Sequence, residues 1–221
     1  MEEKQTDVSF DIIKYSPTTY KILIVGDCKV GKTSLFKKAL KDQFPNNYDT
    51  TFAFEEIYLK AKINSKELNF RIIDMSGNEN FINSIAANFF PKTSLAIIVY
   101  DITSRESYND VENWIAILKS TKVENAILVG NKVDLSESQR QVPQEDLQKK
   151  CGSPEMIKKC MECSAKNGKN VREIFEEAIR TVHDKEKDNL KENTELVPKP
   201  KKRDVVLLVN KNTLNIENIE K

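Results

Sequence analysis

The sequence predicts an α/β fold, namely a doubly wound, six-stranded and mainly parallel sheet with one antiparallel hairpin pair. Two observations support it. Short apolar runs rich in Val, Ile and Leu alternate along the chain with segments of helical composition, and this alternation is typical of parallel strands joined by crossover helices. Polar motifs follow directly after several of these runs. In doubly wound sheets ligands bind at the carboxyl ends of the strands, so the motifs mark the candidate site.

Six strand-like runs and five helical patterns succeed one another along the chain. Strands are expected near 20–26, 52–60, 67–74, 94–100, 126–130 and 159–163, and helices near 32–42, 80–90, 105–120, 143–151 and 170–183. The first run is β-branched and apolar, as in a strand that is buried on both faces. Only residues 62–66 separate the second strand from the third, which is short enough for a hairpin, so that pair is expected to be antiparallel.

Three regions are expected along the chain. Residues 1–17 are polar without periodicity and predict a flexible N-terminal extension, whereas residues 18–183 carry the alternating pattern of an ordered domain. Residues 184–221 are highly charged and include two prolines beside a basic cluster, which predicts a flexible tail. The isolated apolar patch 205–209 within this tail is a candidate docking strand for a partner.

Charge and composition argue against several classes of protein. The 35 basic and 34 acidic side chains leave a net charge of +1, so nucleic-acid binding is not indicated. The four cysteines lack the paired spacing of a zinc site, and free thiols in a reducing compartment are expected. No apolar run approaches the ~18 residues of a membrane span, and the N-terminus has no signal-peptide pattern. A soluble, cytoplasmic protein is expected.

Residues 26–33, GDCKVGKT, match the G-x-x-x-x-G-K-[ST] pattern between an apolar strand and a helix. In that context the two glycines let the backbone curl, so that successive N–H groups form a nest for phosphate oxygens at a helix N-terminus. Lys32 would supply a positive charge to the outer phosphates, and Thr33 a hydroxyl ligand to Mg²⁺. An ordinary turn before an amphipathic helix is the competing interpretation of the motif taken alone.

Three further polar motifs follow strand-like runs in order. They are Asp74-Met75-Ser76-Gly77, Asn131-Lys132-Val133-Asp134 and Ser164-Ala165-Lys166. The chain has only six glycines, and four of them lie in or beside the motifs: Gly26, Gly31, Gly77 and Gly130. Glycine used so sparingly indicates positions at which the backbone must approach a ligand closely. The ordered series therefore favours a nucleotide site over an ordinary turn.

The set GDCKVGKT, Thr51, DMSG, NKVD and SAK resembles the G-box series of the Ras superfamily of small GTPases, over residues 18–183. Segments 89–90, 96–103 and 106–108, together with Trp114, resemble the Rab branch most closely. The resemblance implies a phosphate-loop small GTPase fold, bound GTP or GDP with Mg²⁺, slow GTP hydrolysis and a monomer. It also implies an exchange factor, a GTPase-activating protein and effectors in vesicle and membrane traffic.

The resemblance assigns nucleotide contacts to the residues of the motifs and their neighbours. They are Asp27, Cys28, Lys29, Val30, Gly31, Lys32, Thr33, Ser34, Phe44, Thr51, Gly77, Asn131, Lys132, Asp134, Ser164, Ala165 and Lys166. It implies that Thr33, Thr51 and Asp74 hold Mg²⁺, the last through a water. Lys32 and Asn78 are the candidate catalytic residues.

Asp134 is the residue expected to select guanine. Its carboxylate can accept hydrogen bonds from the N1–H and the amino group of guanine, whereas adenine would leave a desolvated charge unpaired. Asn131 would hold the loop, and the Ala165 N–H would donate to the guanine carbonyl oxygen. The stem of Lys132 and the ring of Phe44 would flank the base and sugar; the alternative for Phe44 is a core aromatic.

Several positions depart from the pattern of this family. Thr50 competes with Thr51 for the metal-ligand role, although the spacing from Thr33 favours Thr51. Cys28 is either tolerated variation or a thiol made reactive by the helix N-terminus and Lys32. Asn78 stands where the family usually has the glutamine that orients the attacking water. Two other functions therefore stay open. One is a GTP-binding scaffold with negligible turnover. The other is an ATP-using kinase or ATPase, although the NKVD and SAK motifs argue against it.

The C-terminal tail bears on membrane association. Rab-like proteins normally end in prenylated cysteines, whereas no cysteine follows Cys163 here. The basic cluster within 199–203 would contribute roughly 1 kcal/mol per charge at an anionic surface, which suffices for weak association but not for stable anchoring. A solvated linker and a nuclear-import-like patch are the alternatives. Weak or partner-mediated association with the cytosolic face of endomembranes is expected.

Overall fold

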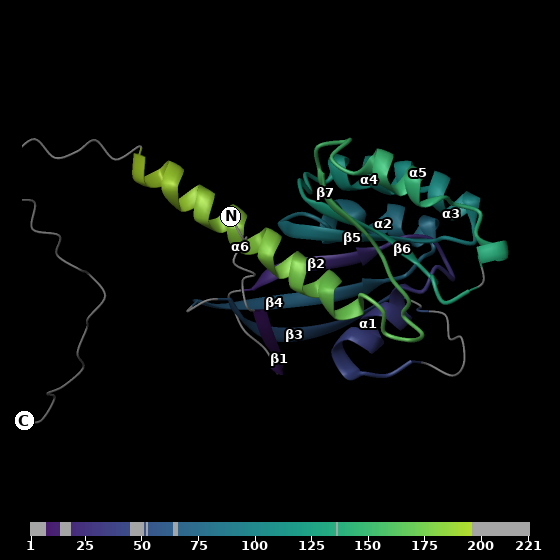
Figure 1. Ribbon diagram of the computed structural model, residues 1–221. Coiled ribbons are helices and arrows are strands. Elements are labelled where there is room, and N and C mark those ends of the chain that lie inside the picture. Colours follow the sequence, from purple (N-terminus) through teal and green to yellow (C-terminus); the bar gives the residue numbers. More distant parts are fainter. Residues whose placement is uncertain are drawn as a thin grey trace, which may run out of the picture. The chain divides into compact units, whose positions relative to one another are not determined.

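A seven-stranded sheet forms the centre of the computed structural model, which describes residues 8–13, 19–44, 51, 53–63, 66–135 and 137–195 (Figure 1). The chain divides into two compact units, residues 1–186 and 187–221. The strand order is β1-β3-β4-β2-β5-β6-β7. The strands are β1 (Val8–Ile13), β2 (Tyr20–Val25), β3 (Phe54–Ile63), β4 (Lys66–Met75), β5 (Thr93–Asp101), β6 (Ala126–Asn131) and β7 (Ile157–Glu162).

The pairing of the strands confirms the predicted α/β class. β2 pairs in parallel with both β4 and β5, and β6 pairs in parallel with β5 and β7. β3 and β4 form the predicted antiparallel pair, with Ile63 opposite Lys66. The sheet is therefore mainly parallel, and loops that follow its parallel strands come together at the carboxyl edge.

The prediction of six strands was wrong, because residues 8–13 form a strand at the edge of the sheet. β1 runs antiparallel to β3, with Val8 opposite Ile63 and Ile13 opposite Tyr58. Val8 is buried, and the Arg172 guanidinium lies 5.3 Å from the centroid of the Phe10 ring. This part of the predicted flexible extension is thus ordered by backbone pairing with a distant strand, for which six residues of mixed polarity give little local signal.

Helices occupy most connections between the strands, and one further helix follows the last strand. They are α1 (Lys32–Lys41), α2 (Glu79–Phe89), α3 (Arg105–Asn109), α4 (Val111–Ser120), α5 (Gln144–Lys150) and α6 (Val171–Glu195), with a short 3₁₀ helix, η1 (Glu137–Gln139). The single helix predicted over 105–120 is divided at Asp110, which ends α3 and precedes α4. Helix α6 continues past residue 183 into the predicted flexible tail, because residues 184–195 contain good helix formers and no proline. The tail from 196 onward, with its basic cluster and apolar patch, lies outside the described residues.

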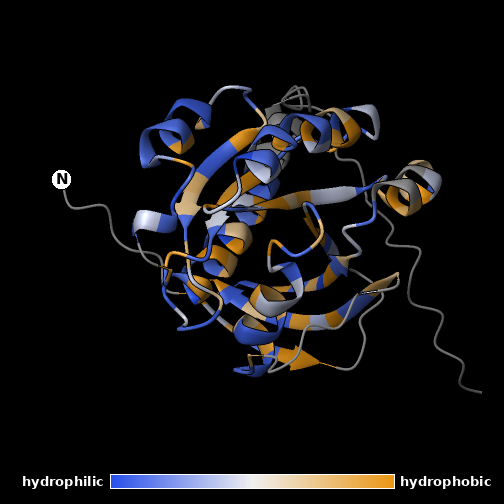
Figure 2. Ribbon diagram, turned by 90° about the vertical axis from the view of Figure 1, so that its right-hand side faces the viewer, coloured by the Kyte–Doolittle hydropathy of each residue, from blue (hydrophilic) through white to orange (hydrophobic). Residues whose placement is uncertain are grey.

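Two hydrophobic clusters, one on each face of the sheet, make up the core of the first unit. One contains residues of α1 and of α6 up to Val182, and the other contains residues of α2, α3, α4 and α5. Figure 1 shows these two groups of helices on opposite faces, and in Figure 2 hydrophobic residues colour long stretches of the strands between them. Helices therefore cover both faces of the sheet, as in a doubly wound α/β fold.

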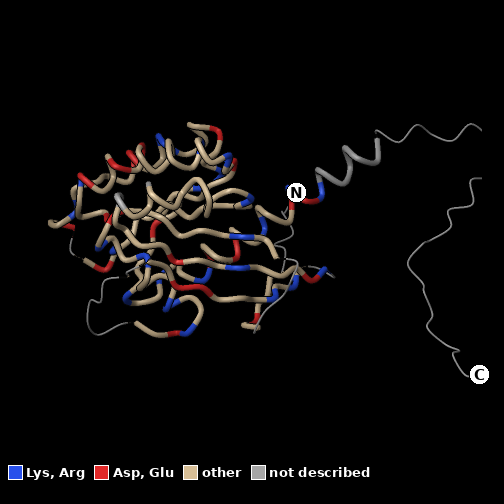
Figure 3. The backbone as a smooth tube through the Cα atoms, turned by 180° about the vertical axis from the view of Figure 1, so that it is seen from behind, with Lys and Arg blue, Asp and Glu red and all other residues tan. Residues whose placement is uncertain are grey.

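Charged residues of both signs are interspersed along the described chain (Figure 3). None of the described helices combines the length and the apolarity that crossing a membrane requires.

Candidate functional site

The predicted motifs meet at the carboxyl ends of four parallel strands. Residues 26–31 connect β2 to α1, and residues 76–78 connect β4 to α2. Residues 132–134 follow β6, and residues 163–170 connect β7 to α6. Strands that pair in parallel end at the same edge of the sheet, so four loops that are distant in sequence surround one region.

Two glycines allow these loops to approach one another closely. Gly31 has φ of 97°, and a Cβ atom there would lie 2.3 Å from Asn131 Nδ2. A Cβ atom on Gly77 would lie 2.5 Å from the backbone nitrogen of Cys28. Any larger residue at either position would push the loops apart. The sequence predicts that these glycines let the backbone approach a ligand, whereas the contacts seen here are between the loops themselves.

Lys32 is a buried cation at the start of α1. Lys32 is 6% exposed, and its Nζ donates to the carbonyl oxygen of Asp27 at 2.6 Å. Burial lowers the pKa of the Lys32 ammonium, an effect that the nearby Asp74 and Asp27 carboxylates oppose. A desolvated ammonium beside a loop of backbone N–H groups is suited to binding an anion.

Three oxygen-bearing side chains converge next to Lys32. Thr33 Oγ1 donates to Asp74 Oδ2 at 2.5 Å and lies 2.9 Å from Thr51 Oγ1. Asp74 is fully buried, and that burial raises the pKa of Asp74 to about 6, against the opposing effects of the Thr33 hydrogen bond and the Lys32 charge. These are the predicted metal residues, and the structure brings all three together.

The other carboxylate oxygen of Asp74, Oδ1, is buried and has no hydrogen-bond partner among the described residues. An unsatisfied buried carboxylate oxygen is costly unless a cation or a water meets it. Among the described residues no group of three His, Cys, Asp or Glu side chains could hold a metal. A hard cation such as Mg²⁺ accepts hydroxyl and single-carboxylate ligands together with waters and phosphates. The residues present therefore fit Mg²⁺.

Asn131 joins three of the loops through one side chain. It is 1% exposed, its Nδ2 donates to Val30 O at 2.9 Å, and its Oδ1 accepts from the Ala165 backbone N–H at 3.1 Å. The expected loop-holding role of Asn131 thus matches its contacts. The Ala165 N–H, which the sequence assigned to a guanine oxygen, is directed at Asn131 instead.

Asp134 and Lys132 are both held by side chains of neighbouring loops. Ser164 Oγ donates to Asp134 Oδ1 at 2.6 Å. Lys132 has φ of 74°, and its Nζ lies 2.6 Å from Asp101 Oδ2. Asp101 was not among the predicted site residues, although an acidic residue at the end of an apolar strand was a signal that could have found it. Lys166 is exposed.

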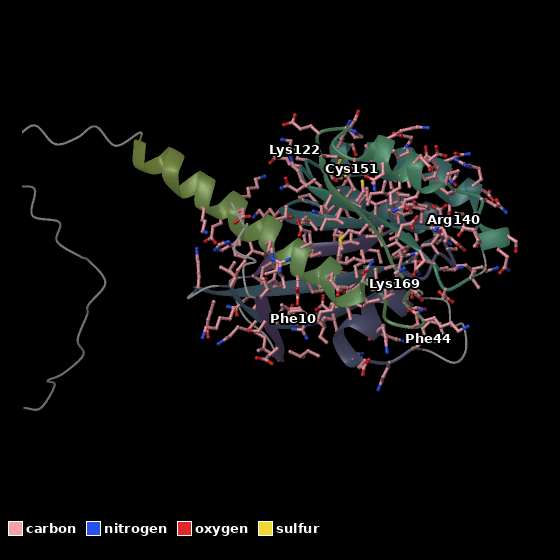
Figure 4. The ribbon with its side chains drawn as sticks, in the orientation of Figure 1. Phe10, Phe44, Lys122, Arg140, Cys151 and Lys169 are labelled. Carbon is pink, nitrogen blue, oxygen red and sulfur yellow. The ribbon has the colours of Figure 1, made fainter. Side chains whose placement is uncertain are left out.

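Phe44 is 41% exposed, so the alternative that it is a core aromatic was wrong. Figure 4 shows it beyond the end of α1.

Cys28 and Lys29 are exposed in the phosphate loop, with Lys29 at φ of 65°, and Ser34 is half-buried in the first turn of α1. None of the four cysteines forms a disulfide in the structure. Thr50, the competitor of Thr51, lies outside the described residues.

Asn78 begins helix α2. Its Oδ1 accepts from the backbone N–H of Phe81 at 3.2 Å, and its own N–H lies 3.3 Å from Ser76 Oγ. The side chain is exposed and serves as the N-cap of the helix. This local role was not part of the sequence prediction, which considered Asn78 only as a shortened replacement for a water-orienting glutamine.

A loop of the G-x-x-x-x-G-K-T type joins β2 to α1, and the other motifs lie at the same edge of the mainly parallel sheet. This combination is that of phosphate-loop α/β proteins. The model of the Ras family matches residues 21–184. The chain is 32% identical over 164 residues to the Ras-related protein Rab-31 of Mus musculus, covering 73% of this chain and 82% of that protein. It is also 32% identical over 157 residues to the Ras-related protein RABE1e of Arabidopsis thaliana, covering 70% and 71%. The chain belongs to the Ras family, and it is a Rab-like small GTPase.

Proposed function

We propose that this protein is a Mg²⁺-dependent guanine-nucleotide switch that hydrolyses GTP slowly and acts in membrane traffic through effectors. The observation that carries the proposal is the Asn131 side chain, which bonds to the phosphate loop at Val30 and to the loop of Ala165. It thereby holds a phosphate-binding segment and a base-binding segment at a fixed separation, as a single nucleotide requires.

Asp134 would select guanine by accepting two hydrogen bonds from the base. Ser164 already fixes one oxygen of this carboxylate at 2.6 Å, so the side chain is oriented before a ligand arrives. An adenine in the same place would leave the carboxylate desolvated and unpaired, which is costly. The stem of Lys132, whose amine is anchored on Asp101, and the half-exposed ring of Phe44 would flank the base and sugar.

The phosphates would lie against the backbone of residues 26–33 and the Lys32 ammonium. Thr33, Thr51 and Asp74 would hold Mg²⁺, and the unsatisfied Oδ1 of Asp74 supports this assignment. When bound, the ion neutralises the charge of the phosphate oxygens. Lys32 would orient the terminal phosphate, and the Gly77 N–H would donate to the same phosphate; the close approach of Gly77 to the backbone of Asp27 and Cys28 supports this assignment.

The switch would consist of the segments around Thr51 and Gly77. Both would contact the third phosphate, directly or through the ion, so hydrolysis would release them together. Ser76 already links the two segments, since its N–H donates to the Ala53 carbonyl at 2.9 Å. The partners that read this change would be an exchange factor, a GTPase-activating protein and effectors. The protein would be a cytoplasmic monomer that reaches endomembranes weakly or through these partners.

A GTP-binding scaffold with negligible turnover is the second candidate, and the engagement of Asn78 as a helix cap favours it. Single-turnover hydrolysis of Mg²⁺-GTP by the full-length protein, followed by phosphate release, separates the two. A slow first-order release that stops when EDTA is added supports the switch. Stable GTP over many hours, with intact binding, supports the scaffold. Release of phosphate from ATP at an equal rate would contradict both.

A further inference from the structure

Trp114 connects helix α4 directly to the phosphate loop. It is the only tryptophan of the chain, it is 1% exposed, and it packs in the hydrophobic cluster that contains residues of α2, α3, α4 and α5. Its indole Nε1 donates to Asp27 Oδ1 at 2.7 Å, across 87 residues of sequence. A buried indole N–H normally finds an acceptor, but here the acceptor is an acidic side chain in the loop proposed to bind phosphates.

Asp27 occupies a crowded position in that loop. Its carbonyl oxygen accepts from Lys32 Nζ at 2.6 Å, and its backbone carbon would lie 2.6 Å from a Cβ atom on Gly77. The residue that carries a negative charge therefore touches both the proposed phosphate-binding lysine and the segment proposed to contact the third phosphate. Its side chain, held by Trp114, points to α4.

An Asp27 carboxylate without this anchor would interfere with anion binding in two ways. Lys32 Nζ already contacts the backbone of the same residue, so a released carboxylate is within reach of the ammonium and would neutralise it. It would also repel phosphate oxygens in the loop, and the interaction between charges is stronger in a partly buried site than in water.

We propose that Trp114 is a positioning residue: its indole N–H holds the Asp27 carboxylate on the α4 side of the phosphate loop and so keeps Lys32 available for nucleotide phosphates. This inference rests on the proposed function. It gives α4 a part in nucleotide affinity although no residue of α4 was assigned to the site.

The test is a double-mutant cycle in the full-length protein, with Mg²⁺-GDP affinity as the readout. Trp114→Phe removes the donor and is expected to weaken GDP binding about tenfold, the magnitude of one hydrogen bond to a charged group. Asp27→Asn in the Trp114→Phe background removes the charge and is expected to restore affinity to within about twofold of Asp27→Asn alone. Loss of packing alone would weaken binding equally in both backgrounds and would not be rescued.

A second variant guards against a folding defect of Trp114→Phe. Benzothienylalanine at position 114 keeps the bicyclic shape of indole but replaces the N–H with sulfur, so it is expected to weaken GDP binding to the same extent at an unchanged melting temperature. Unchanged affinity in this variant, or the absence of rescue by Asp27→Asn, would overturn the inference. Failure of the wild-type protein to bind GDP would instead refute the proposed function.

Discussion

The side-chain oxygen of Asn78 accepts a hydrogen bond from the backbone N–H of Phe81 at 3.2 Å, so the residue that stands in place of the family's water-orienting glutamine caps helix α2. A cap of this kind contributes about 1 kcal/mol to the stability of a helix. In the present structure Asn78 is therefore a local structural residue of α2, and its effect on turnover is a separate question.

Replacing Asn78 with Gln is expected to accelerate intrinsic GTP hydrolysis with little change in nucleotide affinity. Glutamine has one more methylene, and a misplacement near 1 Å can lower a rate ~10²-fold. The same change removes a good cap, so amide hydrogen exchange in the first turn of α2 should become faster. Asn78→Ser is the matched control, because serine keeps the cap but cannot reach the water. Equal rates for the Gln variant and the wild type would contradict the positional argument.

Replacing Asp134 with Ala is expected to weaken GDP binding by several kcal/mol, because the guanine donors would lose their acceptors. Ser164 Oγ would also lose the partner that it holds at 2.6 Å. Isothermal titration with GDP measures the effect, with Glu155→Ala, an exposed acidic residue outside the site, as the control. If both variants bound GDP as the wild type does, Asp134 would have no part in base recognition.

The buried carboxyl of Asp74 should make the metal-free and nucleotide-free protein less stable as the pH rises. Burial raises its pKa from 3.8 to about 6, so folding favours the protonated form, and the stability contributed by this group falls between about pH 4 and pH 6. The difference corresponds to about 3 kcal/mol at neutral pH.

Asp74→Asn is therefore expected to raise the free energy of unfolding in EDTA, more at pH 7.5 than at pH 5, as measured with urea. The same variant should lose the Mg²⁺ dependence of nucleotide binding. A stabilisation that is equal at the two pH values would show that the charge of Asp74 is not its cause.

Strand β1 should contribute to stability without taking part in nucleotide binding. The Arg172 guanidinium lies over the Phe10 ring, 5.3 Å from its centroid, and Phe10 is half-buried. Phe10→Ala is therefore expected to lower the free energy of unfolding by roughly 1–2 kcal/mol. Ser9→Ala, at an exposed position of the same strand, is the control. A marked loss of GDP affinity in the Phe10 variant would mean that β1 influences the site.

The parts of the fold and site that could be predicted from the sequence are those whose signal is local. The phosphate loop is one, because Gly31, Lys32 and Thr33 follow a continuous apolar strand and open a helix. The parts that could not be predicted depend on contacts between distant segments. Strand β1 is held by backbone pairing with β3, which is distant in the sequence. The Trp114–Asp27 hydrogen bond joins residues that are 87 positions apart.

The capping role of Asn78 depends on neighbouring residues, unlike strand β1 and the Trp114–Asp27 hydrogen bond. Asparagine directly before a helical pattern is a common N-cap, so this role has a local signal in the sequence. The Asn78 side chain could cap α2 or point to the nucleotide site, and its contact with the Phe81 N–H shows that it caps the helix in this structure.

The measurement that tests the central claim most directly is a calorimetric comparison of GDP and ADP binding to the nucleotide-free, full-length protein, with Mg²⁺ and with EDTA. Asp134 is oriented by Ser164, and Thr33 contacts both Thr51 and Asp74 Oδ2, while the other Asp74 oxygen is unsatisfied. GDP is therefore expected to bind tightly with Mg²⁺ and much more weakly in EDTA. ADP is expected to bind by several kcal/mol less favourably under both conditions. Equal affinities for GDP and ADP, or GDP binding that is indifferent to Mg²⁺, would contradict the account.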